Sequence, residues 1–422
     1  MRIAHVTDCF LPRMGGIERQ VQGLARAQAA NGHEVDIITS VPVPTAAATS
    51  SVADRADWAG GPAGRSGYDD PVSVIRPQFR GGRPGGIRYS TMLQGRRAVL
   101  DGGYDLVHVH ASTFSPMAYL AAGAASRSGI PTVVTLHSLW SYATPIFRVA
   151  DLGLRWRNWP ITWTAVSRVA AASLQPVLRR GTEVSVLPNA VSPDLWHVHR
   201  GRRDAERSGR PADQTVVIVS VMRLAARKRP LQFLRMLRQV RAGVPAHLRL
   251  QATIIGDGPK RAAMERYLQR HGMTDWVQLT GQLDQPAIRE FFAGADIYAS
   301  PATLESFGIA ALEARSAGLP VVGFAHSGVS DFVADGHNGL LVDTDDEMAA
   351  ALTRLASSPL LRSAMTLHNA RSESGFSWRN VLRICGDVYA LAGAPGPGAA
   401  QLDTRLAARR TGSEPLGGVA AR

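Results

Sequence analysis

The stretch Pro301-Ala-Thr-Leu-Glu-Ser-Phe-Gly-Ile-Ala-Ala-Leu-Glu-Ala-Arg-Ser-Ala-Gly318 decides the fold expected for the second half of this chain. It follows Ile297–Ala299, which is typical of a short buried strand, and from Gly308 onward its apolar residues recur with helical spacing. A helix that begins there leaves backbone N–H groups unpaired, and such groups bind anions. The N–H groups in question belong to Phe307, Gly308, Ile309 and Ala310.

Two glutamates flank the start of this helix. Glu305 lies in the preceding loop and Glu313 one to two turns inside, so their carboxylates should be about 10 Å apart at a rise of ~1.5 Å per residue. That separation is too wide for two carboxylates that share one bond, but it suits an elongated ligand with a central phosphate. A nucleotide sugar fits, with its hexose at Glu305 and its ribose at Glu313. An ordinary surface helix with two glutamates is the alternative.

The composition is that of a soluble, two-domain protein. The chain has 422 residues, of which 45% are hydrophobic, and its mean hydropathy is near zero. We expect no membrane span, because no apolar run approaches ~20 residues, and no signal peptide, because Met1–Thr7 enters a strand directly. Cys9 and Cys385 form no spaced framework, which favours the reducing cytoplasm.

The net charge of +13 and the pI of 10.6 indicate an anionic partner. Nucleic acid, acidic lipid and phosphorylated substrates are all compatible with this charge. Nearly all the cations are arginine, for which a GC-rich genome is a simpler explanation, so the charge alone selects no partner.

Short apolar strands alternate with helices twice along the chain, which predicts an α/β protein of two doubly wound, Rossmann-like domains facing across a cleft. The expected strands are Ile3–Val6, Val35–Thr39, Val72–Ile75, Leu106–Val109, Thr132–Leu136, Trp163–Val166 and Val184–Leu187, then Val216–Val221, Leu250–Ile255, Val277–Leu279, Ile297–Ala299, Val321–Gly323 and Gly339–Val342. The expected helices include Ile17–Ala30 and Arg168–Arg179, followed by helices that start near Arg229, Lys260, Gln285, Gly308, Gly328 and Asp345.

We expect an N-terminal, acceptor-side domain at residues 1–192 and a donor domain at residues 193–375. The helical segment 376–392 should pack back on the first domain, and residues 393–422 should be disordered. Residues 42–71 read as a mobile insertion and residues 198–214 as a hinge or loop.

Ligands of doubly wound sheets bind at the carboxyl ends of the strands, and several motifs lie there. Gly15-Gly16 enters a helix after the first strand and allows a ligand to approach the backbone closely, although a turn that needs positive φ would also explain it. Arg223 and Lys228 follow the strand Val216–Val221 and could clamp a diphosphate without a metal, unless they form a solvated basic loop.

Two further motifs also follow strands. Gly256-Asp257-Gly258 resembles a truncated dinucleotide fingerprint, but Pro259 removes an N–H group, so we interpret it as a tight turn at the nucleotide end of the cleft. His137 ends the strand Thr132–Leu136 and could hydrogen-bond a sugar hydroxyl or stabilise developing charge, if it is not structural.

Two basic clusters suggest surface roles. Cations and aromatics interleave in a pattern that suits an interfacial membrane patch, although a partly buried loop and helix would show it as well; the residues are Arg148, Arg155, Trp156, Arg157, Trp159 and Trp163. A second cluster could hold a phosphorylated acceptor, and it consists of Arg76, Arg80, Arg83 and Arg88.

Together these motifs resemble glycosyltransferase family 4, a retaining group with the GT-B fold, over about residues 1–392. The resemblance is carried by Ser300–Gly318, Val221–Lys228, Ser327–Asp331, Asp335–Val342, Gly15-Gly16, Thr135–His137, Leu187–Ala190 and Phe376–Trp378. The family pattern usually has glycine after the lysine, whereas here Arg229 follows Lys228.

The resemblance implies a role for each site residue. Glu305 would contact the donor sugar and Glu313 the ribose, while Arg223, Lys228 and the backbone near Ile309 would hold the diphosphate. His137 would touch the transferred sugar from the opposite domain. Gly16 would line the phosphate or acceptor side.

A retaining transfer without an enzyme nucleophile implies that the acceptor attacks from the face that the nucleotide leaves, with positive groups stabilising the phosphate. We expect no cofactor and no metal, because no Asp-x-Asp motif stands at a strand end. GDP-mannose is the first donor expected, since the chain resembles actinobacterial mannosyltransferases, and a UDP-sugar is the second. The acceptor would be a lipid, glycan or small-molecule hydroxyl.

Two other functions remain open at this point. A nucleic-acid-binding protein would explain the pI, but the cations are dispersed and no known binding module is present. A nicotinamide-dependent oxidoreductase would explain Gly256-x-Gly258, but no ribose-binding acid follows the next strand.

Overall fold

The computed structural model describes residues 1–11, 15–42, 71–76, 89–140, 144–198, 215–372 and 375–395. Almost all of the insertion expected at 42–71 and of the linker expected at 198–214 lies outside these residues, as does most of the tail expected at 393–422. Arg80, Arg83 and Arg88 also lie outside them.

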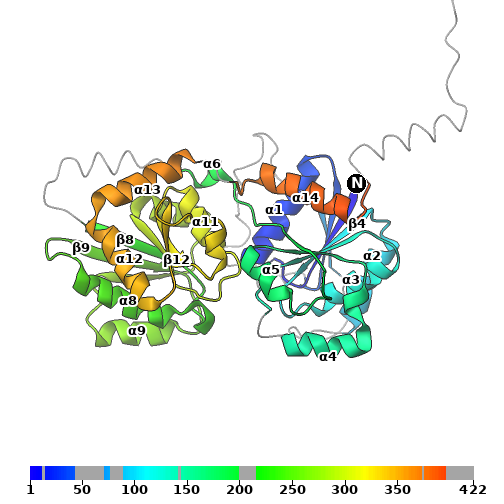
Figure 1. Ribbon diagram of the computed structural model, residues 1–422, viewed down its shortest axis with the longest axis horizontal. Helices are drawn as coiled ribbons and strands as arrows, with labels where there is room; N and C mark the ends of the chain where they lie inside the picture. Colours follow the sequence, from blue (N-terminus) through cyan, green and yellow to red (C-terminus); the bar gives the residue numbers. More distant parts are fainter. Residues whose placement is uncertain are drawn as a thin grey trace, which may run out of the picture.

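The described chain forms two lobes that lie side by side (Figure 1). In the first lobe seven described strands form a parallel sheet in the order β3-β2-β1-β4-β5-β6-β7. The strands are β1 (Arg2–Thr7), β2 (Glu34–Thr39), β3 (Val72–Ile75), β4 (Leu106–Ala111), β5 (Thr132–Leu136), β6 (Thr162–Ala165) and β7 (Val184–Val186). The helices are α1 (Gly16–Ala30), α2 (Tyr89–Asp101), α3 (Pro116–Arg127), α4 (Thr144–Leu154) and α5 (Arg168–Leu174), with a 3-10 turn η2 (Trp156–Asn158).

The second lobe repeats this architecture with six described parallel strands in the order β10-β9-β8-β11-β12-β13. The strands are β8 (Thr215–Val221), β9 (Arg249–Ile255), β10 (Val277–Gly281), β11 (Ile297–Ser300), β12 (Val321–Phe324) and β13 (Gly339–Val342). The helices are α6 (Pro193–Trp196), α8 (Pro230–Gly243), α9 (Arg261–Arg270), α10 (Gln285–Gly294), α11 (Ile309–Ser316), α12 (Asp345–Ser357) and α13 (Pro359–Arg371), with 3-10 turns η3 (Ala226–Lys228) and η4 (Gly328–Asp331).

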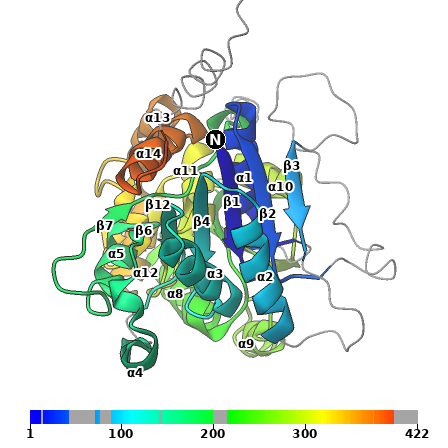
Figure 2. The same ribbon diagram turned by 90° about the vertical axis from the view of Figure 1, so that its right-hand side faces the viewer.

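The parallel sheets follow from strands that are apolar on both faces. Every residue of β4 and of β11 is buried, as expected where helices cover both sides of a parallel sheet. Figure 2 shows α2 and α3 in front of the first sheet and β3 at its edge. The prediction of an α/β protein with two parallel-sheet domains is confirmed.

The final helix crosses back to the first lobe. α14 (Trp378–Leu391) lies beside α1 in Figure 1, and Val191 donates its backbone N–H to the carbonyl of Phe376 at the crossing. Gly23 on α1 makes room for this helix, because a Cβ atom there would lie 2.3 Å from the Trp378 ring. Tyr389 and Cys385 of α14 are buried.

Some predicted boundaries are wrong. The helix expected over Arg168–Arg179 ends at Leu174, where Gln175 and Pro176 follow. The helix expected to start at Gly328 is only a 3-10 turn, which Ser327 caps by accepting from the N–H of Val329. The described helices contain no segment long and apolar enough to cross a bilayer.

Candidate active site

The N-terminus of α11 has the geometry that the sequence predicts. Gly308 is its N-cap with φ of 92°, in the left-handed region, and a Cβ atom there would lie 2.9 Å from a methyl group of Val329. The first intrahelical bond runs from the N–H of Leu312 to the carbonyl of Gly308, at 3.0 Å. The N–H groups of residues 309–311 therefore have no acceptor within the helix, which leaves them for an anion.

A glycine loop of the first lobe lies against this helix start. A Cβ atom on Gly16 would approach the Cδ1 atom of Ile309 to 2.9 Å. Gly16 and the α11 N-terminus, which are almost 300 residues apart in sequence, thus meet at the interface between the lobes. The loop residues 12–14 that precede Gly15 lie outside the described chain.

Lys228 and Glu305 form an ion pair between their side-chain Nζ and Oε2 atoms. Both side chains are largely buried, with 23% and 15% of their surfaces exposed. The two groups lie on separate loops, after β8 and after β11, and the parallel sheet brings them together because β8 and β11 are neighbours. Arg223, the other predicted cation, is exposed beyond the end of β8.

Gly256 has a structural role next to this loop. A Cβ atom on Gly256 would lie 2.0 Å from the carbonyl oxygen of Met222, and its φ is 134°. The N–H of Met222 donates to the carbonyl of Ile255, and the N–H of Leu224 donates to that of Asp257, both at 2.9 Å. The Gly-x-Gly turn therefore fixes the segment that carries Arg223, which explains its glycines without a ligand.

Arg229 takes the backbone conformation that glycine would favour. Its φ is 57° and it caps α8. The guanidinium donates to both carboxylate oxygens of Asp345 at 2.8 and 2.6 Å and to the carbonyl of Pro301 at 3.3 Å. It also lies 5.5 Å from the centre of the Phe324 ring. These contacts stabilise a left-handed arginine directly after Lys228 and tie the two site loops together.

Glu313 is buried on α11, with 5% of its surface exposed. Burial raises the pKa of its carboxyl to about 7, and nearby Arg19 on α1 of the first lobe opposes that shift. A carboxyl in this state can accept hydrogen bonds from hydroxyl groups when it is ionised.

His137 lies at the lobe interface and is buried. The hydroxyl of Ser306, in the second lobe, donates to the backbone carbonyl of His137 at 2.7 Å. The hydroxyl of Ser167 in the first lobe donates to the carbonyl of Ser306 at 2.5 Å. Asp331 accepts from the backbone N–H and the side-chain Nε of Arg168 at 2.9 and 3.1 Å. The predicted residues Glu305 and His137 are thus separated by one bridging residue, Ser306.

Sequence reasoning missed these bridging residues. Ser306 lies inside the quoted stretch, between Glu305 and Phe307, but a serine in a loop gives no signal of a partner in another domain. Ser167 carries the ordinary signature of a helix N-cap, and it does accept from the N–H of Ala170 at 3.0 Å. Its contact with Ser306 is a second function that only the fold shows.

A group of buried histidines was also missed. His5, His108 and His110 place one ring nitrogen each within 4.8 Å of one another, a spacing that could hold a metal ion. Each of their ring nitrogens already has a partner within hydrogen-bond distance in the protein. The group is therefore a hydrogen-bonded network that needs no metal to satisfy it.

The aromatic residues of the expected membrane patch are not on the surface. Trp156 and Trp163 are buried in the core of the first lobe, and the indole N–H of Trp156 donates to the carbonyl of Phe147 at 3.0 Å. Trp159 packs over Gly123 and under the guanidinium of Arg127. The interleaved pattern reflects core packing, so the alternative interpretation of a partly buried loop and helix is correct here.

Arg76 is not free to hold a phosphorylated acceptor. It donates to the backbone carbonyls of Leu11, Val41 and Pro42 at 3.0, 2.7 and 3.5 Å, and it lies over the Phe10 ring at 5.7 Å. The side chain holds the strand-end loops of the first lobe together, which corrects the acceptor role expected for it.

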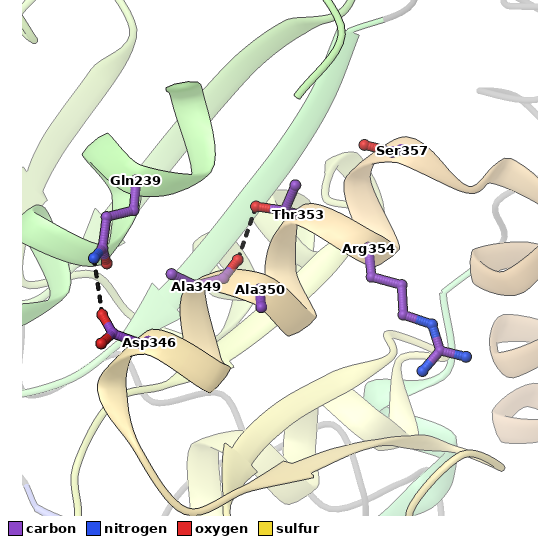
Figure 3. Close-up of a pocket in the computed structure, with 7 residues that line it drawn as sticks. All are labelled: Gln239, Asp346, Ala349, Ala350, Thr353, Arg354 and Ser357. Atoms are coloured by element: carbon purple, nitrogen blue, oxygen red, sulfur yellow. Dashed lines mark hydrogen bonds between the residues drawn. The ribbon is translucent and has the colours of Figure 1, made fainter. Parts of the chain in front are cut away.

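A surface hollow lies elsewhere on the second lobe. Figure 3 shows Gln239 of α8 opposite α12, with a hydrogen bond of 2.9 Å from its amide to Asp346. The lining residues are Gln239, Asp346, Ala349, Ala350, Thr353, Arg354 and Ser357. None of the predicted site residues lines it, and the interface between the lobes remains the candidate site.

Comparison with known proteins agrees with this geometry. The family model described as Glycosyltransferase Family 4 matches residues 14–195, and the one described as Glycosyl transferases group 1 matches residues 202–372. The chain belongs to glycosyltransferase family 4. This glycosyltransferase is therefore an enzyme, as the resemblance implies.

Curated relatives are similar to this glycosyltransferase over most of its length. A phosphatidylinositol N-acetylglucosaminyltransferase subunit of Arabidopsis thaliana is 24% identical over 92% of this chain and 81% of its own length. The human protein of the same name is 27% identical over 92% and 75%. The D-inositol 3-phosphate glycosyltransferase of Saccharomonospora viridis is 29% identical over 76% and 78%.

Solved structures share the fold. Sucrose-phosphate synthase from Thermosynechococcus elongatus superimposes with a TM-score of 0.68 at 20% identity, over 93% of this chain and 99% of that one. HepE from Anabaena, solved with UDP and glucose, superimposes with a TM-score of 0.66 at 18% identity, over 92% and 99%. The GT-B architecture predicted from the sequence is confirmed.

The left-handed backbone at Arg229 can be tested by two substitutions. Arg229→Ala and Arg229→Gly both lose the contacts with Asp345, Pro301 and Phe324, but only glycine adopts a φ of 57° without strain. We expect the alanine variant to be less stable than the glycine variant by about 1 kcal/mol in urea unfolding. Equal stabilities, or a more stable alanine variant, would contradict this backbone conformation.

The buried carboxyl of Glu313 predicts a pH-dependent stability. Its pKa of about 7 in the folded protein exceeds the ordinary 4.5, so the folded state binds the proton more tightly. This contribution is fully present below pH 4.5 and is lost as the pH rises through 7. Relative to the wild type, Glu313→Gln should therefore be more stable at pH 8 than at pH 5.5, by roughly 1–3 kcal/mol.

The exposed Glu290 on α10 provides the control, since Glu290→Gln changes a carboxyl that is in solvent in both states. Urea unfolding of the three proteins at pH 5.5 and pH 8 measures the effect. A Glu313→Gln difference that does not depend on pH would show that the carboxyl is not buried as described.

Proposed function

We propose that this glycosyltransferase moves a hexose, with retention of anomeric configuration, from a nucleotide-diphosphate sugar to a hydroxyl acceptor at the lobe interface. The observation that supports it is the meeting of the α11 N-terminus, the Lys228–Glu305 pair and His137 around Ser306. A phosphate-binding helix end, a cation and two groups able to hydrogen-bond a sugar are the parts that such a donor needs.

In this proposal the donor separates the Lys228–Glu305 pair. The diphosphate would take the ammonium of Lys228 together with the free N–H groups of α11, and Glu305 would then accept from the hexose hydroxyls. Arg223, exposed at the end of β8, would contact the diphosphate. Glu313 would accept from the ribose hydroxyls, and Gly16 would line the phosphate side.

The bond changes balance without an enzyme nucleophile. The acceptor oxygen forms a bond to the anomeric carbon while the bond from that carbon to the β-phosphate oxygen breaks. The acceptor proton passes to the departing phosphate, and the nucleoside diphosphate leaves on the same face. Lys228, Arg223 and the helix end stabilise the negative charge that grows on the phosphate. We propose that no metal is required for this step.

A uridine nucleotide is the donor that the comparisons favour. HepE was solved with UDP-glucose, and TarM from S. aureus with UDP, whereas GDP-mannose, the first donor expected from the sequence, has no such support. We therefore place a UDP-hexose ahead of GDP-mannose for this protein.

The names of the relatives also suggest an acceptor class. Phosphatidylinositol and D-inositol 3-phosphate share a phosphorylated cyclitol, and another relative, from Acholeplasma laidlawii, is named alpha-monoglucosyldiacylglycerol synthase. We propose a hydroxyl of a phosphorylated polyol, free or in a lipid headgroup, as the acceptor.

The donor and the phosphate clamp can be tested together. At ~100 times its dissociation constant, the correct nucleotide should stabilise the protein by about 2.7 kcal/mol in thermal unfolding, with UDP ahead of GDP. Lys228→Met should lower kcat/KM for sugar transfer by about 10²–10³ because it removes a charge that stabilises the leaving group. The control is Arg235→Met, which removes an exposed cation from α8.

Transfer should persist in EDTA, and the product should keep the anomeric configuration of the donor. If neither nucleotide stabilises the protein, or if Lys228→Met transfers sugar at the wild-type rate, the proposed site is wrong.

We further propose that α4 associates peripherally with anionic membranes. Its surface carries the apolar Val149 and Leu154, which are 68% and 59% exposed, next to Arg148 and Arg155. Apolar side chains beside arginines suit a helix that lies in the headgroup region.

Sedimentation with vesicles that contain an anionic lipid measures this association. We expect binding by the wild-type protein, loss of binding in the double variant Val149→Ser/Leu154→Ser, and no loss in Leu360→Ser, which alters an exposed leucine of the other lobe. Equal sedimentation of all three proteins, or of none, would exclude α4 as the contact.

A further inference from the structure

The buried histidines form a continuous hydrogen-bonded relay that ends at His137. His5 lies on β1, His108 and His110 lie on β4, and His137 follows β5, so the relay crosses three neighbouring strands of the first sheet. All four rings are buried. Gln28 of α1 and Tyr389 of α14 join the relay from the helices that cover this face.

One arm of the relay runs from Gln28 away from the histidine of the site. The amide Nε2 of Gln28 lies 2.7 Å from the hydroxyl of Tyr389, and that hydroxyl lies 2.8 Å from Nδ1 of His108. Nε2 of His108 is 2.7 Å from the Thr135 hydroxyl, which is 2.5 Å from that of Thr164. The arm ends where Thr164 donates to the carbonyl of Val134 at 3.3 Å.

The end of this arm sets the direction of every bond in it. A carbonyl oxygen can only accept, so the single proton of Thr164 goes to Val134, and the proton of Thr135 goes to Thr164. His108, when neutral, then donates from Nε2 to Thr135 and accepts at Nδ1 from Tyr389.

The hydroxyl oxygen of Tyr389 in turn accepts from the Gln28 amide nitrogen. The amide of Gln28 is thereby turned so that its oxygen faces His5.

The other arm continues from this oxygen to the lobe interface. Nε2 of His5 lies 2.6 Å from Oε1 of Gln28, and Nδ1 of His5 lies 2.8 Å from Nε2 of His110. Nδ1 of His110 lies 3.1 Å from Nε2 of His137. Because the amide oxygen only accepts, His5 must donate to it, His110 must donate to His5, and His137 must donate to His110.

We propose that this relay holds His137 as the Nε2–H tautomer, so that its Nδ1 is a hydrogen-bond acceptor presented at the lobe interface. Nδ1 has no partner among the described residues and is not one of their fully buried unpaired atoms. Gln28, His5, His110 and Tyr389 are thus positioning residues for His137.

The relay requires neutral rings, and their burial keeps them neutral. Desolvation lowers the pKa of His5 and of His137 to about 4, and it holds the pKa values of His108 and His110 well below the ordinary 6.5. A neutral ring with one proton must donate at one nitrogen and accept at the other. Each step of the relay therefore passes its direction to the next ring.

The chemical consequence rests on the proposed function. His137 would accept a hydrogen bond from a hydroxyl of the transferred hexose, and it could neither donate to an oxyanion nor supply positive charge. Of the two roles expected from the sequence, this tautomer permits the hydroxyl contact alone. The stabilising charge would come from Lys228 and α11.

Nitrogen NMR of the histidine rings tests the tautomer directly. In protein labelled with ¹⁵N-histidine, long-range ¹H–¹⁵N spectra separate protonated from unprotonated ring nitrogens, and His137→Gln identifies the signals of residue 137. We expect the wild-type protein at pH 7.5, without any ligand, to show His137 with a protonated Nε2 and an unprotonated Nδ1. A protonated Nδ1 would overturn the proposal.

Two isosteric substitutions test whether the relay sets this tautomer. Tyr389→Phe removes the junction between the two arms, so Gln28 loses its fixed orientation and the single-tautomer signal of His137 should give way to a mixture. Tyr104→Phe is the control, since it removes a buried hydroxyl that is bonded to Asp36 in the same lobe but touches no member of the relay. It should leave the signal of His137 unchanged.

An unchanged His137 spectrum in Tyr389→Phe would refute the role of the relay, even if the wild-type tautomer is as expected. The spectra need no substrate and no turnover. A protein with the expected tautomer that binds no nucleotide would therefore refute the proposed function and leave the relay standing, so the two failures can be told apart.

Discussion

The contact that organises the site is the bridge through Ser306. Its hydroxyl donates to the carbonyl of His137, and its own carbonyl accepts from the hydroxyl of Ser167, so one residue of the second lobe is held by two residues of the first. Each such hydrogen bond contributes only about 1 kcal/mol net. The ion pair of Arg168 with Asp331 adds little, because the arginine side chain is 72% exposed. The lobes are therefore held in register by a few weak contacts, which a ligand at the interface could rearrange.

The residues next to Ser306 take their environments from this bridge. Glu305 on one side is drawn into a pair with Lys228, while Phe307 on the other side is buried against Phe332 and Phe376. Gly308 then turns the chain so that α11 begins at the interface with unpaired N–H groups. Anchoring by a buried phenylalanine before the helix and a left-handed glycine at its N-cap gives the phosphate site a rigid backbone, as preorganised electrostatic stabilisation requires.

Polar groups in the centre of the first sheet are an unusual use of a parallel core. Burying unpaired imidazoles would be strongly unfavourable, and the relay avoids this by giving each nitrogen of His5, His108 and His110 a partner. It also connects the last helix of the chain, α14, to the site through Tyr389. The return of the C-terminal segment to the first lobe therefore completes the network behind His137 as well as the packing around Gly23.

The sequence by itself determined the two parallel sheets and the start of α11, because strand and helix periodicity and the φ of Gly308 are local properties of the chain. It also singled out Lys228, Glu305 and His137, since each directly follows a strand and strand ends converge in this fold. The tertiary structure alone decided that Lys228 pairs with Glu305, that Trp156 and Trp163 belong to the core, and that Arg76 is engaged by carbonyls. It alone revealed Ser306, Ser167 and the relay, because these depend on contacts between segments more than 100 residues apart. No local pattern carries the burial and the partners that such contacts create.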